Sequence, residues 1–435
     1  MTRSDRRNFL TGATVGAAGL LTSPRAQAAT DERLVVGVIG AGGMGRGHLN
    51  SLKGIPNIEV KWIADVDQSH VNEGKKIIPD AKTTGDLREV LDDKSVDAVW
   101  ITTPDHWHTP AALLAMDAGK HVYVEKPCCH NLREGRWLIE ASKRTGKLVQ
   151  HGTQSRSAPL IQTAIKLLRS GVIGTVLVAR AWNVQYRGAI GHEKPSEPPQ
   201  HFDYDSWVGP APMVPFQRNR QHYSWHWWHA FGTGDAGNDG VHEIDIARWG
   251  LGVETHPTHI AAIGGKYVHD DDQEFPDTIT AAFEYPGEGN VGQRRQLLFE
   301  MRLWSRYHPF SMDNGNEFLG TNGRMLLTKR GSLEVFGNKG EKIDVSLPDN
   351  KLVSITPHEI NFLEAIRGRA VLAADATTAH LSSALPHLAN LACRTGRSIQ
   401  FSPEKESVLN DPEADRLLGR TYREGHWGVP KEAGK

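Results

Sequence analysis

The first half of the chain alternates short apolar runs with helical patterns. The apolar runs lie at residues 34–39, 58–64, 96–102, 120–124 and 147–151. Each is short and bounded by turn residues, which predicts buried strands. Between them, Thr109-Pro110 is expected to open a helix with proline at its first position. Asn131, with Glu134 three residues later, predicts a capping box at the start of another helix. Strands that alternate with helices predict a doubly wound parallel sheet.

The pattern changes at about residue 158. A helix is expected at 159–170, a strand at 175–187, and then a long loop rich in Pro, Trp and His to about residue 231. Segments at 257–268, 277–285, 295–303, 324–329 and 333–336 alternate between apolar and polar positions. This alternation predicts an open, mostly antiparallel sheet with one apolar face. Helices are expected at 358–367 and 377–395, and a polar tail from residue 401 is expected to cover the surface.

A glycine motif, G-A-G-G-M-G at residues 40–45, directly follows the first predicted strand. This context is typical of a dinucleotide-binding turn. Gly40 makes the tight turn, Gly42 allows the backbone to approach a pyrophosphate, and Gly45 lets helix and strand pack closely. The next strand ends at Asp65, where an acid binds ribose hydroxyls. Since a 2′-phosphate would meet that carboxylate, the sequence predicts NAD, with NADP less favoured.

Composition narrows the class of protein. The 435 residues carry 50 Lys and Arg against 51 Asp and Glu, a net charge of −1. This balance gives no electrostatic reason to expect binding to nucleic acid or to an anionic membrane. The three cysteines, Cys128, Cys129 and Cys393, do not predict a disulfide framework or a metal site.

The first thirty residues predict a twin-arginine export signal. The motif is Arg6-Arg7-Asn8-Phe9-Leu10, followed by a mild apolar stretch at about 11–22 and an A-x-A cleavage site at 26–28. The stretch is too short to span a bilayer well. The expected location is therefore the periplasm, with no membrane span once the signal is removed. An uncleaved anchor stays open as an alternative.

Several motifs together resemble the glucose–fructose oxidoreductase / inositol dehydrogenase / MocA (Gfo/Idh/MocA) family. They are Glu125-Lys126-Pro127, a G-x-H-x-x-D helix at 240–245, and the segments 152–157, 203–210 and 380–394. The resemblance covers about residues 34–428 and is strongest to the family's exported bacterial branch. It implies NAD(P)-dependent chemistry on sugars and polyols, and a sheet that makes oligomer contacts. A homodimer or homotetramer is therefore expected.

The resemblance also implies a role for Lys126. It places this side chain beside the nicotinamide, where an ammonium near a developing alkoxide favours loss of the hydroxyl proton. It implies, too, a cis peptide bond between Lys126 and Pro127.

The predicted fold class is α/β. A signal peptide (1–30) precedes an NAD-binding Rossmann domain (31–157), a doubly wound parallel sheet. A substrate-binding and oligomerisation α+β domain (158–375) with an open, mostly antiparallel sheet follows, and then a C-terminal helix and surface tail (376–435).

The helix expected to begin near Asn238 carries the candidate base. Asn238, His242, Asp245 and Trp249 are spaced to lie on one helical face. His242 is the candidate general base because imidazole titrates near neutrality. Many family members have an Asp where this chain has Asn238, and an amide cannot carry charge. Asp245, three residues after His242, is the alternative partner of the histidine.

His222, His226 and His229 alternate with Trp225, Trp227 and Trp228. The H-x₃-H-x₂-H spacing can bind zinc on a helix, but the favoured interpretation is a wall that stacks on a sugar, without a metal. The predicted catalytic residues are Lys126, His242, Asn238 and Asp245. The predicted substrate contacts are Lys126, Asn238, His242, Trp227 and His229. The predicted cofactor contacts are Gly40, Gly42, Gly43, Met44, Gly45, Asp65, Thr103, Pro104, His106, His108, Glu125, Lys126 and Gln154.

These features predict an NAD-dependent oxidoreductase that acts on a CH–OH group of a sugar, polyol or sugar derivative. Because a pool that regenerates NAD is not expected outside the cytoplasm, the nucleotide should stay tightly bound. One alternative is a redox-neutral glycosidase or epimerase of the same family. A second is a noncatalytic sugar- or nucleotide-binding protein, which Asn238 favours.

Overall fold

The computed structural model describes residues 33–287 and 292–434. The predicted export signal lies outside these residues. The chain from Arg33 onward forms one compact unit. Within the described residues, no helix has the length and apolarity that a membrane crossing needs.

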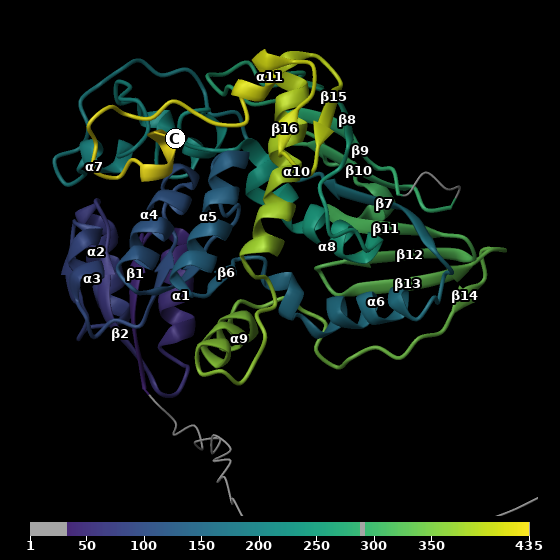
Figure 1. Ribbon diagram of the computed structural model, residues 1–435, viewed down its shortest axis with the longest axis horizontal. Helices are drawn as coiled ribbons and strands as arrows, with labels where there is room; N and C mark the ends of the chain where they lie inside the picture. Colours follow the sequence, from purple (N-terminus) through teal and green to yellow (C-terminus); the bar gives the residue numbers. More distant parts are fainter. Residues whose placement is uncertain (1–32, 288–291, 435) are drawn as a thin grey trace, which may run out of the picture. The chain divides into compact units, whose positions relative to one another are not determined.

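The first half forms a six-stranded, wholly parallel sheet in the order β3-β2-β1-β4-β5-β6 (Figure 1). Its strands are β1 (Leu34–Ile39), β2 (Ile58–Ala64), β3 (Lys82–Thr84), β4 (Ala98–Ile101), β5 (His121–Val124) and β6 (Val149–His151). The connecting helices are α1 (Gly43–Leu52), α2 (Gln68–Ile77), α3 (Leu87–Asp92), α4 (Asp105–Asp117) and α5 (Leu132–Thr145). The predicted doubly wound sheet is therefore confirmed. The edge strand β3 was not predicted, because its K-T-T sequence is polar and mostly exposed.

The predicted start of α5 is close to the observed one. The Asn131 side chain accepts a hydrogen bond from the Glu134 backbone N–H at 3.2 Å. The Glu134 carboxylate reaches back to the N–H of His130, one residue earlier than a capping box requires. The N-cap is confirmed, and the reciprocal contact is shifted by one position.

The predicted start of α4 is wrong. The helix begins at Asp105, so Pro110 lies inside it rather than at its first position. An interior proline has no N–H for the carbonyl four residues earlier, which is that of His106. The Arg420 guanidinium donates to this carbonyl oxygen at 2.7 Å. A residue more than 300 positions away therefore supplies the hydrogen bond that the proline cannot make.

The second half forms a ten-stranded mixed sheet in the order β14-β13-β12-β11-β7-β10-β9-β8-β15-β16. The strands are β7 (Val176–Asn183), β8 (His259–Gly265), β9 (Thr278–Tyr285), β10 (Arg295–Arg302), β11 (Asn314–Gly320), β12 (Gly323–Thr328), β13 (Ser332–Gly337), β14 (Lys342–Ile343), β15 (Ile399–Ser402) and β16 (Ser407–Val408). Only β7 and β10 pair in parallel among neighbours in this order, so the mostly antiparallel prediction is confirmed.

The central strand β11 was missed because it begins with the polar sequence N-G-N-E. Asn316 is nevertheless fully buried, and its amide donates to the Glu243 carbonyl at 2.7 Å. A neighbouring helix thus accepts from the buried amide nitrogen, which local periodicity cannot indicate, while the Asn316 side-chain oxygen has no partner among the described residues.

Helices cover one face of the mixed sheet. They are α6 (Pro159–Arg169), α8 (Val241–Leu251) and α10 (Ala376–Thr395), whose apolar side chains share one core with the strands. Helix α9 (Thr356–Ile366) packs instead against the parallel sheet, where Phe362 contacts Trp100 edge-on at 5.4 Å. Helix α9, which follows β14 of the mixed sheet in sequence, therefore packs on the first half of the molecule (Figure 1).

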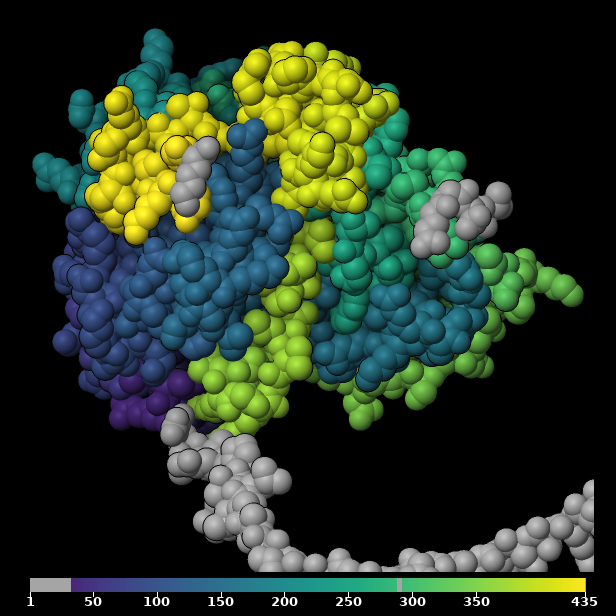
Figure 2. Space-filling view, in the orientation of Figure 1, coloured from purple at the N-terminus to yellow at the C-terminus, as the bar shows by residue number. Residues whose placement is uncertain are grey.

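The C-terminal segment, which contains the short helix α11 (Pro412–Arg416), returns to the first half of the molecule (Figure 2). The buried Glu134 carboxylate accepts hydrogen bonds from Arg420 at 2.8 Å and from the Tyr422 hydroxyl at 2.7 Å. Arg423 pairs with Asp205 of helix α7 (Tyr204–Val208) at 2.7 Å. The tail is thus fixed at both a buried and an exposed ion pair.

We expect Arg420→Gln to lower the free energy of unfolding by about 3 kcal/mol. The variant leaves the Glu134 carboxylate buried without its cation, and breaking a buried pair has that cost. Arg423→Gln is the matched control, because its partner is 64% exposed and exposed pairs contribute less than about 1 kcal/mol. Urea unfolding of both variants measures the difference. Equal, small losses would contradict a buried anchor at Arg420.

Candidate functional site

A cleft of about 800 Å³ opens at the carboxyl ends of the parallel strands, between them and the long loop at about 188–231. Its lining includes the predicted residues Gly40, Gly42, Gly43, Met44, Asp65, Thr103, Pro104, His108, Glu125, Lys126 and Asn238. Parallel α/β sheets bind ligands at this edge. Strand order brings together the residues that follow β1, β2, β4 and β5, whereas Asn238 reaches the cleft from the second half of the chain.

The glycine loop has the shape that a pyrophosphate requires. Gly40 has φ of +96°, which favours glycine. A Cβ at Gly45 would lie 2.0 Å from the Gly40 carbonyl oxygen, so helix α1 could not approach β1 with any side chain there. At Gly43, by contrast, a Cβ would meet nothing within 4 Å. The loop thus presents bare backbone and a helix N-terminus to the cleft, which fits a dinucleotide phosphate.

Asp65 joins the second strand to this loop. One carboxylate oxygen accepts the Ala41 N–H at 2.6 Å, and the other accepts the Asp67 N–H at 2.8 Å. The carboxylate is therefore fixed at the cleft wall, where it suits ribose hydroxyls and disfavours a 2′-phosphate. Farther along the same cleft, the Arg88 guanidinium lies 4.5 Å from the ring centroid of Trp427, which comes from the C-terminal tail.

Lys126 connects the two halves of the molecule at the cleft. The Lys126–Pro127 peptide bond is cis, as expected. The Lys126 ammonium donates to the Asn238 carbonyl at 2.6 Å and to the Asn238 side-chain oxygen at 3.1 Å. The Asn238 amide nitrogen donates to Asp235 at 2.8 Å and lies 3.5 Å from the Tyr223 hydroxyl. Asn238 thus fixes the lysine and takes part in a polar chain that ends at Tyr223.

A buried ionic cluster supports the residue before the lysine. His48 lies between two carboxylates, 3.1 Å from Glu125 and 2.7 Å from Glu359. Burial by itself lowers the pKa of His48, but the hydrogen bonds to Glu125 and Glu359 raise it to about 9. Burial raises the pKa of Glu125, because it disfavours the charged carboxylate. The hydrogen bond and the charge of His48 have the larger, opposite effect and lower this pKa to about 2. The cluster therefore holds an imidazolium between two carboxylates at pH 7.

His242 is neutral at pH 7. Burial, together with the charges of Lys329 and Lys126, lowers its pKa to about 3. Its Nδ1 is buried and has no hydrogen-bond partner in the part of the chain that the structure describes. The ring is 7% exposed and is not part of the cleft lining. A neutral imidazole has a lone pair that can accept a proton, but a pKa of about 3 makes it a weak base at pH 7.

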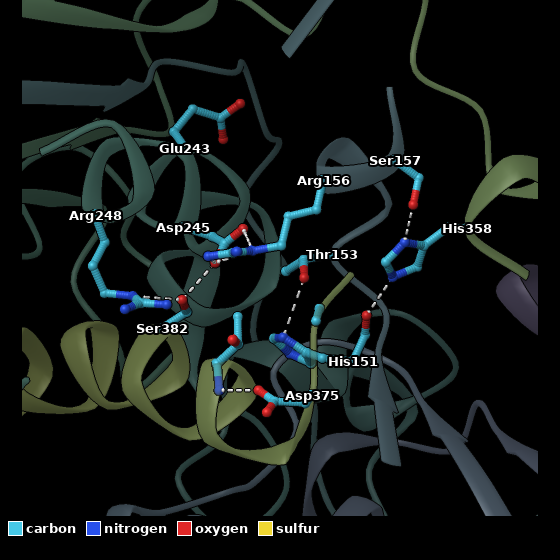
Figure 3. Close-up of polar contacts among 12 residues, drawn as sticks. His151, Thr153, Arg156, Ser157, Glu243, Asp245, Arg248, His358, Asp375 and Ser382 are labelled. Atoms are coloured by element: carbon cyan, nitrogen blue, oxygen red, sulfur yellow. Dashed lines mark hydrogen bonds and ion pairs between the residues drawn. The ribbon is translucent and has the colours of Figure 1, made fainter. Parts of the chain in front are cut away.

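Asp245 does not partner His242. Its carboxylate pairs with the Arg156 guanidinium at 2.8 and 2.9 Å and also accepts from the Ser382 hydroxyl at 2.5 Å (Figure 3). These contacts lie within a buried network, away from the cleft lining. The expectation that Asp245 replaces the missing acid is therefore corrected: the sequence spacing is right, but Arg156 takes the carboxylate.

The turn before α8 also differs from the helix expected there. Residues Ala236–Gly240 form a π-helical turn, and the α-helix begins only at Val241. The wider turn changes the face on which Asn238 lies relative to His242 and Asp245. A regular helix from Asn238, as expected from the sequence, is therefore not observed.

Besides Gly45, His242 and Trp227, three further predicted contacts are absent from the cleft lining. His106 is buried, with its ring nitrogens near the carbonyls of Trp207 and Phe231, so it links the two halves. Gln154 is absent from the cleft lining. His229 packs on Phe275 with ring centroids 4.3 Å apart. For these residues, position at a strand end or in an aromatic loop was not enough to define orientation.

The His- and Trp-rich segment at 222–229 lines two different pockets. His222, Tyr223, Trp225 and His226 line the nucleotide cleft, whereas Trp227 lines a second pocket. No group of described residues brings the ligand atoms of His222, His226 and His229 together, so these histidines do not form the H-x₃-H-x₂-H zinc arrangement. Tyr223, Arg88 and Trp427 were missed, because nothing in their local sequence marks them as site residues.

Two other groups bring possible metal ligands together among the described residues. They are Asp67 with His70 and His222, and His256 with His380 and Glu406. In the first, His222 lies 2.9 Å from Asp67. In the second, both histidines bond to Glu406, which also pairs with Arg136. Ion pairs and hydrogen bonds within each group account for these arrangements, and the prediction of no metal stays a prediction.

Comparison with known proteins identifies the family. Residues 34–153 match the model of the oxidoreductase family with an NAD-binding Rossmann fold. Residues 159–284 and 334–428 match the C-terminal alpha/beta domain of the same family. The chain belongs to the Gfo/Idh/MocA family and is an NAD-dependent oxidoreductase.

The individual proteins that this chain resembles share only a modest part of its sequence. The chain is 25% identical over 272 residues to the uncharacterized oxidoreductase YrbE of Bacillus subtilis, covering 62% of this chain and 69% of the relative. It is 28% identical over 209 residues to a glycosyl hydrolase family 109 protein of Shewanella pealeana, covering 41% and 45%. The matched region thus spans less than half of that relative. Levoglucosan dehydrogenase, solved with NADH and L-sorbose, has the same fold at 18% identity, with a TM-score of 0.66 over 85% of this chain and 98% of that one.

We expect Asn238→Asp to move the acidic limb of the pH dependence of kcat/KM upward by about one pH unit. A carboxylate near His242 favours the imidazolium, typically by 1–3 pKa units at about 4–6 Å. Asn238→Ala is the control, and should lower kcat without moving the limb. The readout is NAD reduction at 340 nm across pH 3–7, because a rise of about one unit from a pKa of about 3 falls within that range. An unchanged limb in Asn238→Asp would show that position 238 does not govern the base.

We expect His48→Gln to lower the free energy of unfolding by about 3 kcal/mol at pH 6, and by much less above pH 9. The pKa of His48 is raised from 6.5 to about 9 on folding, so its contribution is complete below 6.5 and lost as pH rises through 9. Urea unfolding at pH 6 and pH 9.5 measures this loss. His121→Gln is the control, since burial lowers the pKa of His121 to about 4. Its difference from wild type should not shrink over that range.

Proposed function

We propose that the protein oxidises a CH–OH group of a sugar, polyol or sugar derivative and retains its nucleotide between half-reactions. The observation that carries this proposal is the position of Lys126. Its ammonium lies in the same cleft as the bare glycine loop and is held by Asn238 from the opposite half of the molecule. A hydroxyl bound beside it would be next to both a cation and the nucleotide-binding edge.

Each residue has a defined task in this proposal. Bound NAD supplies the hydride acceptor. Lys126 stabilises the developing alkoxide by charge and hydrogen bonding. Neutral His242, which does not line the cleft, accepts the hydroxyl proton through a water molecule. Asn238 orients Lys126 but cannot take the proton, because its amide does not titrate in the working range.

Replacement of Lys126 tests the chemistry separately from cofactor binding. We expect Lys126→Met to lower kcat by at least about 100-fold, because the charge beside the alkoxide is lost. NAD affinity should change less than about threefold, since the glycine loop and Asp65 are intact. Single-turnover absorbance at 340 nm with a sugar and polyol panel measures the first, and calorimetric titration with NAD the second. Full activity in Lys126→Met would overturn the assignment.

Asp65 tests the choice of nucleotide. Wild-type protein should release NAD on denaturation, as identified by mass spectrometry, and should bind NADP at least about tenfold more weakly. Asp65→Ser should narrow that difference by removing the carboxylate. Tighter binding of NADP than of NAD by the wild type would contradict the proposal.

A redox-neutral glycosidase is the second candidate, favoured by the similarity to glycosyl hydrolase family 109 proteins. In this reaction the oxidation is reversed after bond cleavage, so glycoside is consumed without net accumulation of NADH. Monitoring glycoside hydrolysis and 340 nm absorbance together separates the two. A noncatalytic binding protein would show ligand binding and neither signal.

Export and assembly complete the proposal. Twin-arginine transport carries folded proteins, which suits a chain that must keep its nucleotide. Replacing Arg6 and Arg7 by Lys should leave the protein in the cytoplasmic fraction of a host with this pathway. The mixed sheet is proposed as the contact of a dimer or tetramer, to be measured by light scattering.

A further inference from the structure

The adenosine end of the nucleotide cleft follows from the order of the parallel strands. Asp65, which suits the adenosine ribose, follows β2, whereas Lys126 follows β5 on the other side of β1. The order β3-β2-β1-β4-β5-β6 therefore puts the segment after β3 beyond Asp65 and farthest from Lys126. Since the nicotinamide belongs beside Lys126, the adenine belongs at the end of the cleft formed by the segment after β3.

Two exposed side chains line the cleft at this end. Arg88 lies in the first turn of α3, directly after β3, and its side chain is 53% exposed. Trp427 comes from the C-terminal tail and is 38% exposed. The Arg88 guanidinium lies 4.5 Å from the centre of the Trp427 ring. Because Arg88 is fixed to the segment after β3, this contact places the tail tryptophan at the adenosine end.

Arg88 is held by contacts that use only the edge of its guanidinium. Its Nε donates to the Asp86 carboxylate at 2.9 Å, and a terminal nitrogen donates to the same carboxylate at 2.6 Å. A bidentate pair of this kind lies along the edge of the planar group and leaves its faces for stacking. The pair also balances the charge of Arg88, so this end of the cleft has no cation reserved for a further phosphate.

Trp427 is fixed by packing on α4, although it stays exposed. Its ring lies 5.4 Å from that of Trp107, and the next residue, Gly428, has no side chain to hold the tail away from the Trp107 ring. A few residues earlier, Arg420 anchors the tail to the buried Glu134 carboxylate at 2.8 Å. A ring that is already held in position loses little conformational entropy when a ligand binds to it.

The chemistry of this pair suits a purine base. Aromatic rings and guanidinium planes are the protein groups on which bases stack, whatever the hydrogen-bonding pattern of the base. An exposed tryptophan at the wall of a cleft also gains from the burial of its apolar surface by a flat ring. The adenine of NAD is such a ring, and the strand order puts it at this end of the cleft.

We propose that the C-terminal tail retains the nucleotide: Trp427, together with Arg88, contacts the adenine and slows the release of NAD. The inference rests on the proposed function, in which the protein keeps its nucleotide between half-reactions. The glycine loop and Asp65 hold the pyrophosphate and ribose from the first strands of the chain. Trp427 adds a contact from the tail, so NAD leaves only when its adenine has left a ring that is fixed to α4.

The test measures release of the nucleotide rather than turnover. Protein loaded with labelled NAD is chased with an excess of unlabelled NAD, and the label that stays on the protein is followed with time. We expect Trp427→Ala to raise the dissociation rate at least about tenfold, because the base loses a stacking partner. Trp427→Phe keeps an aromatic ring and should raise this rate less than about threefold.

Two further variants show whether the effect belongs to this pair. Trp304→Ala is the matched control, since the Trp304 indole donates to Thr278 at 2.8 Å and the residue does not line the cleft. It should leave the dissociation rate unchanged. Arg88→Ala should raise the rate, and its effect should not multiply fully with that of Trp427→Ala, because the two side chains touch.

Fragments of the nucleotide locate the contact. ADP-ribose keeps the adenosine and the pyrophosphate, whereas nicotinamide mononucleotide lacks the adenosine. Displacement of labelled NAD by each fragment, corrected for the NAD affinity of each variant, gives the Kd of the fragment. Trp427→Ala should weaken binding of ADP-ribose by about the same factor as binding of NAD. It should leave the Kd of nicotinamide mononucleotide at its wild-type value.

The outcomes separate this proposal from the proposed oxidation. An unchanged dissociation rate in Trp427→Ala, or an equal loss of affinity for both fragments, overturns the role of the tail. If Trp427→Ala does not fold, Trp427→Leu, which keeps an apolar contact with Trp107 but has no ring, is measured in the same way and should also release NAD at least about tenfold faster. Failure of every sugar and polyol to reduce NAD would overturn the oxidation alone, because no step of this test needs a substrate.

Discussion

The hydrogen bonds from Lys126 to Asn238 determine how the two halves of this protein work together. Lys126 follows β5 of the parallel sheet, whereas Asn238 lies in the turn that begins α8 on the mixed sheet. One ammonium bonds to both the carbonyl and the side chain of that asparagine. The reacting group is therefore positioned by backbone and side chain together. An aspartate at 238 would add charge to this contact, but the carbonyl bond alone would already place the lysine.

The charges around this contact are arranged so that the base stays neutral. Glu125, next to Lys126, is neutralised by His48, which is shared with Glu359. Asp245 is neutralised by Arg156, and Asp239 by Arg187 and Lys329. Burial and the charges of Lys329 and Lys126 lower the pKa of His242, and they outweigh the opposite effect of Asp239 and Glu125, which already pair with cations. Ion pairs elsewhere in the core thus influence the pKa of His242. The spacing of Asn238, His242 and Asp245 along one helix could not indicate these ion pairs.

Local sequence sufficed for the parts of the fold that depend on local physics. The apolar strands, the turn at Gly40 and the cap at Asn131 follow from short-range sterics and hydrogen bonding. Prediction failed where a distant partner decides the outcome. Pro110 lies inside α4 because Arg420 bonds to the His106 carbonyl, and β11 is a central strand although its first residues are polar. Residues at strand ends were placed correctly as a group, but side-chain direction separated His106 and Gln154 from the cleft.

The C-terminal tail has contacts that its polar sequence did not indicate. Its sequence suggested a covering of the surface, yet Arg420 pairs with a buried carboxylate and Trp427 lines the nucleotide cleft beside Arg88. The family match to residue 428 includes this segment. Gly428 explains the close approach, because a Cβ there would lie 2.6 Å from the Trp107 ring. The tail therefore reaches α4 through a residue without a side chain, and Trp427 lines the same cleft as Gly40 and Met44.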